Sequence, residues 1–207
     1  MPRKNEIDML HGPLLAKIII FAMPLAASSI LQQLFNSVDV AVVGRFDSSY
    51  ALAAVGSNGP VISLLINLFL GISMGANVVI SNHIGQKDNN LTKYAIRTTA
   101  ATALFSGLAL AVIGVLAARP ILTIMGTPTE VLDMAVRYLR IYFIGTPFLL
   151  IYNFGSAILR SKGDTSRPLY ILIVAGIINT VLNLILVIVF HMGVAGVAIA
   201  TDIANVF

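Results

Sequence analysis

Polar side chains recur at helical spacing within an apolar segment near the N-terminus. Ser28, Gln32 and Asn36 are four residues apart, and Asp39 follows three residues later. These offsets place all four side chains on one face of a helix. An ionisable side chain at the centre of a bilayer costs ~2.5–3.5 kcal/mol on insertion scales, and it faces a cavity or other helices rather than lipid. Asp39 is therefore the first candidate for a functional residue.

Further oxygen donors occur in apolar segments later in the chain. Asn179 and Asn183 are four residues apart and share a helix face, and Asn153 and Thr201 lie in the segments on either side of them. Carboxylate, amide and hydroxyl oxygens suit a proton or a small cation such as Na⁺ better than a soft metal. The chain has no cysteine, which removes thiolate ligands. We expect no metal beyond a possible Na⁺ at Asp39.

The polar residues also have a structural interpretation, since amides and hydroxyls hold membrane helices together by hydrogen bonds. A second acid, Asp202, either lies in the same cavity as Thr201 or is exposed near the end of the sequence, and both interpretations stay open. Gly71 and Gly75 form a small-xxx-small pattern that predicts close packing inside the bundle. The residues predicted to line a cavity are Gln32, Phe35, Asn36, Asn153 and Asp202.

The composition is that of an integral membrane protein. Of the 207 residues, 57% are hydrophobic and 11% are charged, whereas soluble domains have about a quarter charged. A helix needs roughly 20 apolar residues to cross a bilayer. The stretches without Asp, Glu, Lys or Arg are Ile18–Val38, Ser48–Gln86, Thr98–Ala118, Ile141–Leu159 and Pro168–Thr201. They predict helices at about 14–43, 52–84, 94–118, 130–159, 169–190 and 194–207.

The expected fold is thus an all-α bundle of five complete transmembrane helices and the start of a sixth. The segment Ser48–Tyr50 is expected to be a loop. Nine lysines and arginines flank one side of these spans and four flank the other. By the positive-inside rule, we expect a multi-pass protein of the cell (plasma or inner) membrane with a cytoplasmic N-terminus.

Several functional classes are disfavoured by the sequence. It contains no phosphate-binding glycine-rich loop, no G-x-S-x-G elbow and no metalloprotease helix. We therefore expect no enzymatic activity, no organic cofactor and no nucleic-acid partner. The expected surroundings are the lipid bilayer and a small molecule.

Four segments resemble multidrug and toxic compound extrusion (MATE) transporters, and within them the DinF-type branch. The first is 24–44, with its proline, paired glutamines and Val38-Asp39. The others are Leu52-Ala53-Ala54-Val55-Gly56, 163–168 (GDTSRP) and 193–201 (GVAGVAIAT). The resemblance implies a twelve-helix transporter of two lobes that exports amphipathic or cationic molecules in exchange for H⁺ or Na⁺. Residues 1–207 would be its N-terminal lobe, truncated within the sixth helix, and the missing partner would be the C-terminal lobe.

The resemblance also implies a cation site. In the DinF-type branch this site uses an acid on the first helix, two residues one turn apart on the fifth and a threonine on the sixth. Asp39, Asn179 and Thr201 match that pattern. Asn183 departs from it, because the family often has Asp followed by Pro, and here Leu184 follows. With Asp39 alone the site carries one negative charge, which either one proton or one Na⁺ would neutralise.

Two alternatives to drug efflux are compatible with the sequence. One is a lipid-linked oligosaccharide flippase of the same superfamily, although the lysines and arginines cluster at the span ends rather than in a cavity. The other is a truncated membrane protein that does not transport, since one lobe supplies half a cavity.

Overall fold

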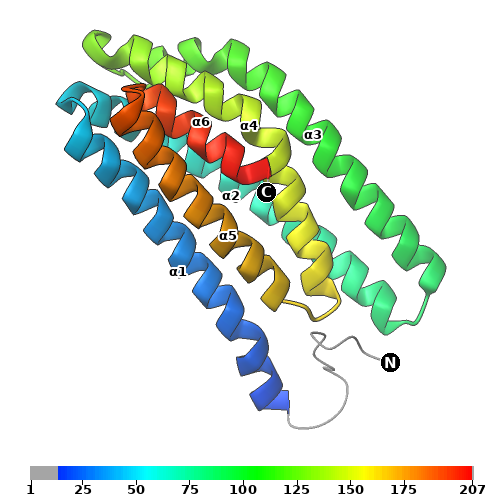
Figure 1. Cartoon of the computed structure of the whole chain (residues 1–207). Helices are drawn as coiled ribbons and strands as arrows, with labels where there is room; N and C mark the ends of the chain where they lie inside the picture. The colour runs from blue at the N-terminus through cyan, green and yellow to red at the C-terminus, as the bar shows by residue number, and fades with distance from the viewer. Residues whose placement is uncertain (1–13, 207) are drawn as a thin grey trace.

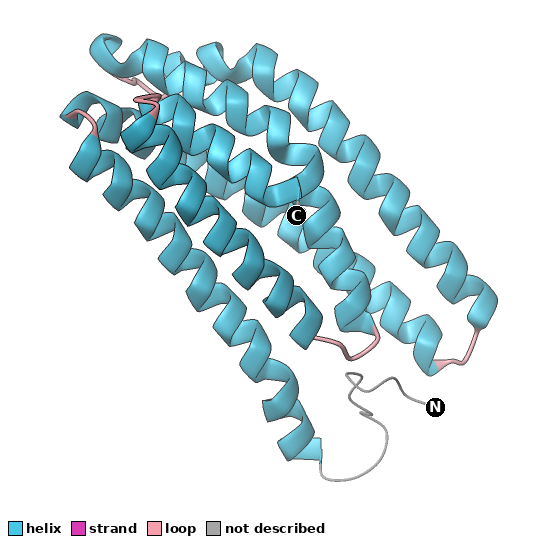
Figure 2. Ribbon diagram, in the orientation of Figure 1, coloured by secondary structure: helices cyan, strands magenta, loops and turns pink. Residues whose placement is uncertain are grey.

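The computed structural model describes residues 14–206, which form helices joined by short turns (Figures 1 and 2). The elements in chain order are α1 (Leu14–Phe46), α2 (Ser49–Gly85), α3 (Asn89–Ile124), α4 (Thr129–Ser161), α5 (Ser166–Leu184), the π-helix η1 (Ile185–Val189) and α6 (Gly193–Val206). Five spans, the last combining α5 with η1, are long and apolar enough to cross a membrane. The all-α, five-span fold predicted from the sequence is confirmed.

The observed helices are longer at several ends than the expected ones. Ser49 and Tyr50 belong to α2 rather than to a loop, because the Ser48 hydroxyl caps the helix by accepting the Ala51 N–H at 3.1 Å. Asp88 caps α3 in the same way, so α3 begins at Asn89 instead of residue 94. At its other end α3 continues past Arg119 to Ile124. A helix can leave the apolar layer without ending, so the charge-free stretches underestimate its length.

The fifth span differs from the expected single helix at 169–190. Its α-helical part starts at Ser166 and ends at Leu184, one residue after Asn183, and continues as η1. The Phe190 N–H donates to the Ile185 carbonyl at 3.1 Å, which is the π-helical pattern. Gly193, with φ +53°, then starts α6. Within α6 the described residues end at Val206, so the expected end at residue 207 lies outside them.

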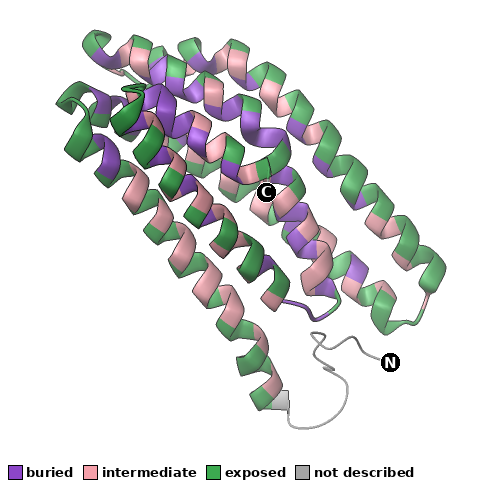
Figure 3. Cartoon of the chain, viewed as in Figure 1, coloured by how far each residue is buried: buried purple, intermediate pink, exposed green. Residues whose placement is uncertain are grey.

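Helix α4 lies at the centre of the bundle. It packs against α2, α3 and α6, and 61% of its most apolar window is buried, against at most 22% in any other span. Two amides from α2 donate across this interface: Asn58 Nδ2 to the Ala135 carbonyl at 3.1 Å and Asn77 Nδ2 to the Ala157 carbonyl at 2.8 Å. In Figure 3 the buried residues concentrate along α4 and α6, while the outer helices expose apolar side chains suited to lipid.

Close helix approach occurs on α3 rather than at the glycines of α2. A Cβ at Gly71 or Gly75 would meet nothing within 4 Å, so the prediction that this pair packs inside the bundle is wrong for this lobe. By contrast, a Cβ at Gly107 would lie 2.6 Å from the Pro147 Cα, and one at Gly114 would overlap the Phe143 ring. The α3–α4 contact therefore depends on small residues.

The two ends of the bundle carry different amounts of positive charge. Arg45, Arg119, Arg137 and Arg140 lie toward the end that holds the α1–α2, α3–α4 and η1–α6 turns. The opposite end has seven described lysines and arginines, namely Lys17, Lys87, Lys93, Arg97, Arg160, Lys162 and Arg167. The nine basic residues counted from the sequence on this side also include Arg3 and Lys4, which lie outside the described residues.

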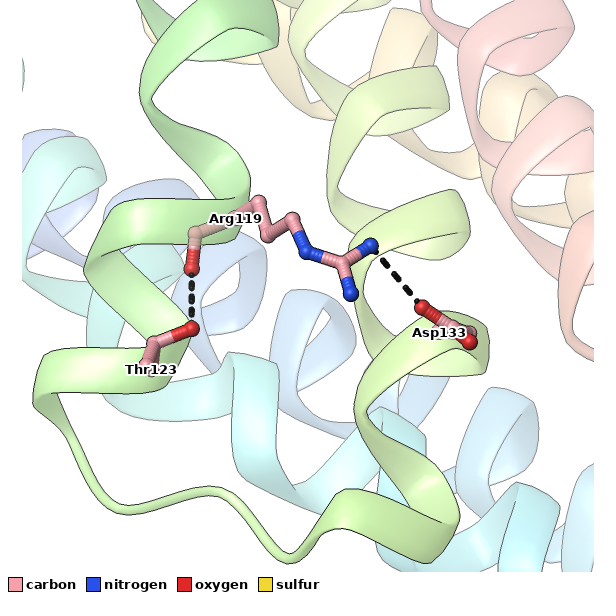
Figure 4. Close-up of polar contacts among 3 residues, drawn as sticks. All are labelled: Arg119, Thr123 and Asp133. Atoms are coloured by element: carbon pink, nitrogen blue, oxygen red, sulfur yellow. Dashed lines mark hydrogen bonds and ion pairs between the residues drawn. The ribbon is translucent and has the colours of Figure 1, made fainter.

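An ion pair joins α3 to α4 at the first of these ends (Figure 4). Arg119 Nη1 lies 3.0 Å from Asp133 Oδ1, and the two side chains are 57% and 83% exposed. An exposed pair of this kind contributes about 0–1 kcal/mol. It therefore stabilises the contact between the helix ends only weakly. Most of the packing between α3 and α4 comes from apolar side chains and from the close contacts at glycines.

Replacement of Gly114 by alanine should destabilise the lobe. The added methyl group has no room beside Phe143, so we expect a loss of about 1–3 kcal/mol, typical of overpacking. Thermal unfolding of the purified protein in detergent measures the effect. Gly71→Ala is the matched control, because its Cβ enters open space on a helix. Equal midpoints for the two variants would contradict the α3–α4 packing described above.

Candidate functional site

Asp39 lies in a chain of polar side chains that joins three helices. Asn183 of α5 donates a short hydrogen bond from Nδ2 to Asp39 Oδ1 on α1. The same amide nitrogen contacts Asn179 Oδ1 at 3.3 Å. Asn179 Nδ2 in turn donates to Thr201 Oγ1 of α6 at 3.2 Å, and that hydroxyl donates to the Val197 carbonyl at 3.0 Å. The four residues thus form one hydrogen-bonded group.

Most of this group is removed from solvent. Asn183 is fully buried and Asn179 is 6% exposed, while Asp39 and Thr201 are half-buried. The helical repeat explains the arrangement, since Asn179 and Asn183 stand one turn apart on a single face of α5. Asp39 approaches that face from α1 and Thr201 approaches it from α6, because α5 contacts both helices.

A close contact between an aromatic ring and a glycine sets the spacing of α1 and α5. Phe35 lies one turn before Asp39, and its ring fills the space that a Cβ on Gly176 would occupy. Gly176 lies three residues before Asn179, on the same side of α5. A larger residue at position 176 would require the Phe35 ring to move, which would disturb the contact of α1 with α5 beside Asp39 and Asn183.

The available ligands at this site are all oxygen atoms. They are the Asp39 carboxylate, the two amide oxygens and the Thr201 hydroxyl. The Asn183 Oδ1 is buried and has no hydrogen-bond partner among residues 14–206. Hard oxygen donors of this kind fit a proton on the carboxylate or a small hard cation. The described residues contain no cluster of three His, Cys, Asp or Glu side chains that would hold a softer metal.

The predicted cavity-lining residues do not join this group. Gln32 is half-buried and Asn36 is exposed, while Phe35 covers Gly176. Asn153 is buried on α4, with no hydrogen bond to the Asp39 group. Two apolar grooves of the described residues lie elsewhere, between α2, α3 and α4, with volumes of about 370 and 500 Å³. A cavity role for Gln32, Asn36 and Asn153 stays a prediction.

Asp202 is half-buried rather than exposed, and a place in the cavity beside Thr201 stays a prediction. Its carboxylate is half-buried against Gly145 of α4, and Oδ1 occupies the space that a Cβ on that glycine would need. Neighbouring residues of a helix point about 100° apart, so Thr201 can face α5 while Asp202 faces α4. The contacts of Gly176 and Gly145 could not be predicted from a local pattern, because each joins residues far apart in the chain.

Residues 24–185 match the MatE family, which is more than half of the sequence. The chain belongs to this family. A similar relative is the probable multidrug resistance protein YoeA of Bacillus subtilis, 35% identical over 191 residues, which cover 90% of this chain and 41% of YoeA. The probable multidrug resistance protein YpnP of the same organism is 31% identical over 200 residues, covering 96% of this chain and 44% of YpnP.

A solved structure supports the same conclusion. The crystal structure of a MATE in complex with MaD3S superposes with a TM-score of 0.90 at 26% identity, covering the whole of this chain and 46% of that one. The chain therefore has the fold of one lobe of a MATE transporter, and it spans less than half the length of the curated relatives it matches. The family resemblance drawn from the sequence is confirmed, and the DinF-type branch stays a prediction.

Removal of the Asn183 amide should destabilise the lobe more than removal of an exposed amide. Asn183→Ala removes the donor to Asp39 Oδ1 and to Asn179 Oδ1 in a buried setting, and loss of such a donor costs about 1–3 kcal/mol. Asn36→Ala is the control, because Asn36 is exposed on α1. Thermal unfolding of both variants in the same detergent makes the comparison. Indistinguishable unfolding temperatures would show that the Asp39–Asn183 contact does not hold α1 against α5.

Proposed function

We propose that this chain is the N-terminal lobe of a cation-coupled multidrug efflux antiporter of the cell membrane. The antiporter would export amphipathic or cationic small molecules in exchange for H⁺ or Na⁺. The observation that carries this proposal is the position of Asp39, the acid of a hydrogen-bonded group shared by α1, α5 and α6. The names of YoeA and YpnP, both probable multidrug resistance proteins, support the substrate class.

Coupling follows from the way Asp39 connects the helices. When the carboxylate is charged it accepts from Asn183, and that amide also contacts Asn179. Neutralisation by a proton weakens this charge-assisted hydrogen bond. A bound metal cation would instead compete with the Asn183 amide N–H groups for the carboxylate and amide oxygens. In either case the ion favours the helix arrangement that binds it more tightly. The free-energy difference between the two arrangements changes by the difference in their binding free energies for the ion.

The mobile element in this mechanism is α1. None of its most apolar window is buried in the lobe, so little packing opposes its movement. Pro24 lies inside the helix, and a proline removes one backbone hydrogen bond and favours a bend. The Ser28 hydroxyl donates to the Pro24 carbonyl at 2.7 Å, which satisfies one of the backbone groups there. Neutralisation of Asp39 would release the far end of the same helix from α5.

The site carries one negative charge, so one monovalent cation balances it. Asn183 stands where the DinF-type pattern often has a second acid, and an amide adds an oxygen donor without adding charge. A proton needs only the carboxylate, whereas Na⁺ would also use the amide and hydroxyl oxygens. Either ion could therefore be the coupling ion, and the transport assay below distinguishes H⁺ from Na⁺.

The proposed orientation places the end with Lys17, the α2–α3 turn and the α4–α5 turn in the cytoplasm, since this end has more lysines and arginines. The second, C-terminal lobe would complete the substrate cavity.

A flippase for lipid-linked oligosaccharides is less well supported. Recognition of a diphosphate calls for basic side chains in the cavity, and the described lysines and arginines lie toward the helix ends.

Replacement of Asp39 by asparagine in the full-length protein should abolish ion-driven efflux. Coupling energies of 1–3 kcal/mol correspond to about 5–150-fold effects, so we expect at least a tenfold loss of drug extrusion from loaded proteoliposomes. Asp133→Asn is the control, because Asp133 is an exposed acid at the bundle end. Wild-type rates that persist in Asp39→Asn would overturn the proposed role of Asp39.

The coupling ion is identified in the same vesicles. A pH gradient without Na⁺ and a Na⁺ gradient at equal pH are imposed separately on the wild-type protein. Efflux should follow at least one of the two gradients, and the response to that gradient should vanish in Asp39→Asn. Efflux that follows neither gradient would contradict cation coupling.

A further inference from the structure

The larger of the two described grooves lies between α2 and α3, away from the Asp39 group and outside the proposed mechanism. It has a volume of about 500 Å³, and sites for small molecules occupy about 300–1,000 Å³. His83 and Leu91 line its end beside the α2–α3 turn (Figure 1), and Thr102 lines its far end. From Leu91 to Thr102 helix α3 rises roughly 16 Å, which is about half of the ~30 Å apolar layer of a bilayer. The groove therefore has the depth of one lipid leaflet.

One wall of this groove is mostly apolar, and the other carries hydroxyl groups. Helix α2 contributes Ile72 and Val79, and Phe154 of α4, which is 1% exposed, forms the floor. On α3, the groove residues Tyr94, Thr98 and Thr102 recur every four positions and share one face. All three are exposed, and their hydroxyl groups make no hydrogen bond to another residue of 14–206. The groove thus offers hydrogen-bond donors beside an apolar floor.

Positive charge surrounds the end of the groove at the α2–α3 turn. Lys87 lies in the turn, and Lys93 and Arg97 come directly before the groove residues Tyr94 and Thr98. Neighbouring helix positions point about 100° apart, so these long side chains flank the groove and can extend their charged ends toward it. All three basic residues are exposed, and the ion pairs of the described residues do not include them.

The acid of this turn leaves most of that charge uncompensated. Asp88 is the one acidic residue between positions 80 and 105. Its Oδ1 already accepts the N–H groups of Asn90 and Leu91 at 3.0 and 2.9 Å. Three positive charges are thus accompanied by one negative charge at this end of the groove. The balance favours an anionic occupant and disfavours a cationic drug.

The smaller groove, toward the other end of the bundle, has a different lining. Its residues are apolar, and they include Leu64, Ile113 and Met125. At that end of the bundle, Arg119 is paired with Asp133. An apolar lining offers no donor to a lipid headgroup, whereas the α2–α3 groove joins an apolar floor to hydroxyl and basic groups.

We propose that the α2–α3 groove binds an anionic phospholipid. Its acyl chain would lie along Val79 and Phe154, and its phosphate would lie at the basic end formed by Lys87, Lys93 and Arg97. Basic pockets between membrane helices bind acidic lipid headgroups, and each lysine or arginine near the headgroup contributes about fivefold in affinity. This binding is independent of the proposed transport function, and the proposed orientation decides only which leaflet supplies the lipid.

Native mass spectrometry of the full-length protein tests the proposal by titration with phosphatidylglycerol or phosphatidylcholine of the same acyl chains. We expect phosphatidylglycerol to bind at least tenfold more tightly. Lys93→Gln should weaken its binding about fivefold, and the addition of Arg97→Gln should weaken it further. Lys162→Gln is the matched control, because Lys162 is an exposed lysine of the α4–α5 turn at the same end of the bundle and does not line the groove. Equal affinities for the two lipids would overturn the proposal.

A second variant tests the place of the acyl chain without a change of charge. Thr102→Phe should fill the deep end of the groove and remove one tightly bound phosphatidylglycerol. Ala101→Phe is its control, because Ala101 is exposed on the same turn of α3 but does not line the groove. Glycerol phosphate, the soluble part of the headgroup, should not compete at the concentrations at which the lipid binds. Displacement of the lipid by glycerol phosphate, or unchanged lipid binding in Thr102→Phe, would contradict an acyl chain in this groove.

Discussion

The hydrogen bond from Asn183 to Asp39 is the contact on which the account of this lobe depends. A carboxylate in the apolar layer needs a donor, and α5 supplies one from a residue that is itself fully buried. The same amide group leads through Asn179 to Thr201, so three helices meet at one acid. An event that changes the charge of Asp39 therefore changes the balance of forces between α1, α5 and α6.

The rest of the bundle keeps this group in place without taking part in it. Helix α4 is packed on several sides and is held by amides from α2 and by the glycines of α3. In contrast, α1 is the least buried span, and its contact with α5 includes the close fit of Phe35 on Gly176. A fixed core beside a lightly packed helix is compatible with the proposed movement of α1 against the rest of the lobe.

Much of this architecture follows from the sequence by simple physics. The charge-free stretches located the five spans, and the spacing of Asn179 and Asn183 placed them on one face. Asp39 stood out because an acid in a span is costly. The helix ends were less predictable, since caps such as Ser48 and Asp88 extend helices beyond the apolar layer. The π-helix after Leu184 has no periodicity that distinguishes it from the preceding α-helix. The contact of Asp202 with Gly145 joins residues 57 positions apart, and no local pattern marks it.

Cation binding to the purified protein tests the central claim most directly. Proton uptake is followed with a pH indicator, and Na⁺ uptake with radioactive sodium, in the wild type and in Asp39→Asn under equilibrium conditions without a drug. The account predicts that the wild type binds at least one of these ions at Asp39, and that Asp39→Asn loses one bound cation per protein. Equal cation binding by the two proteins would contradict it.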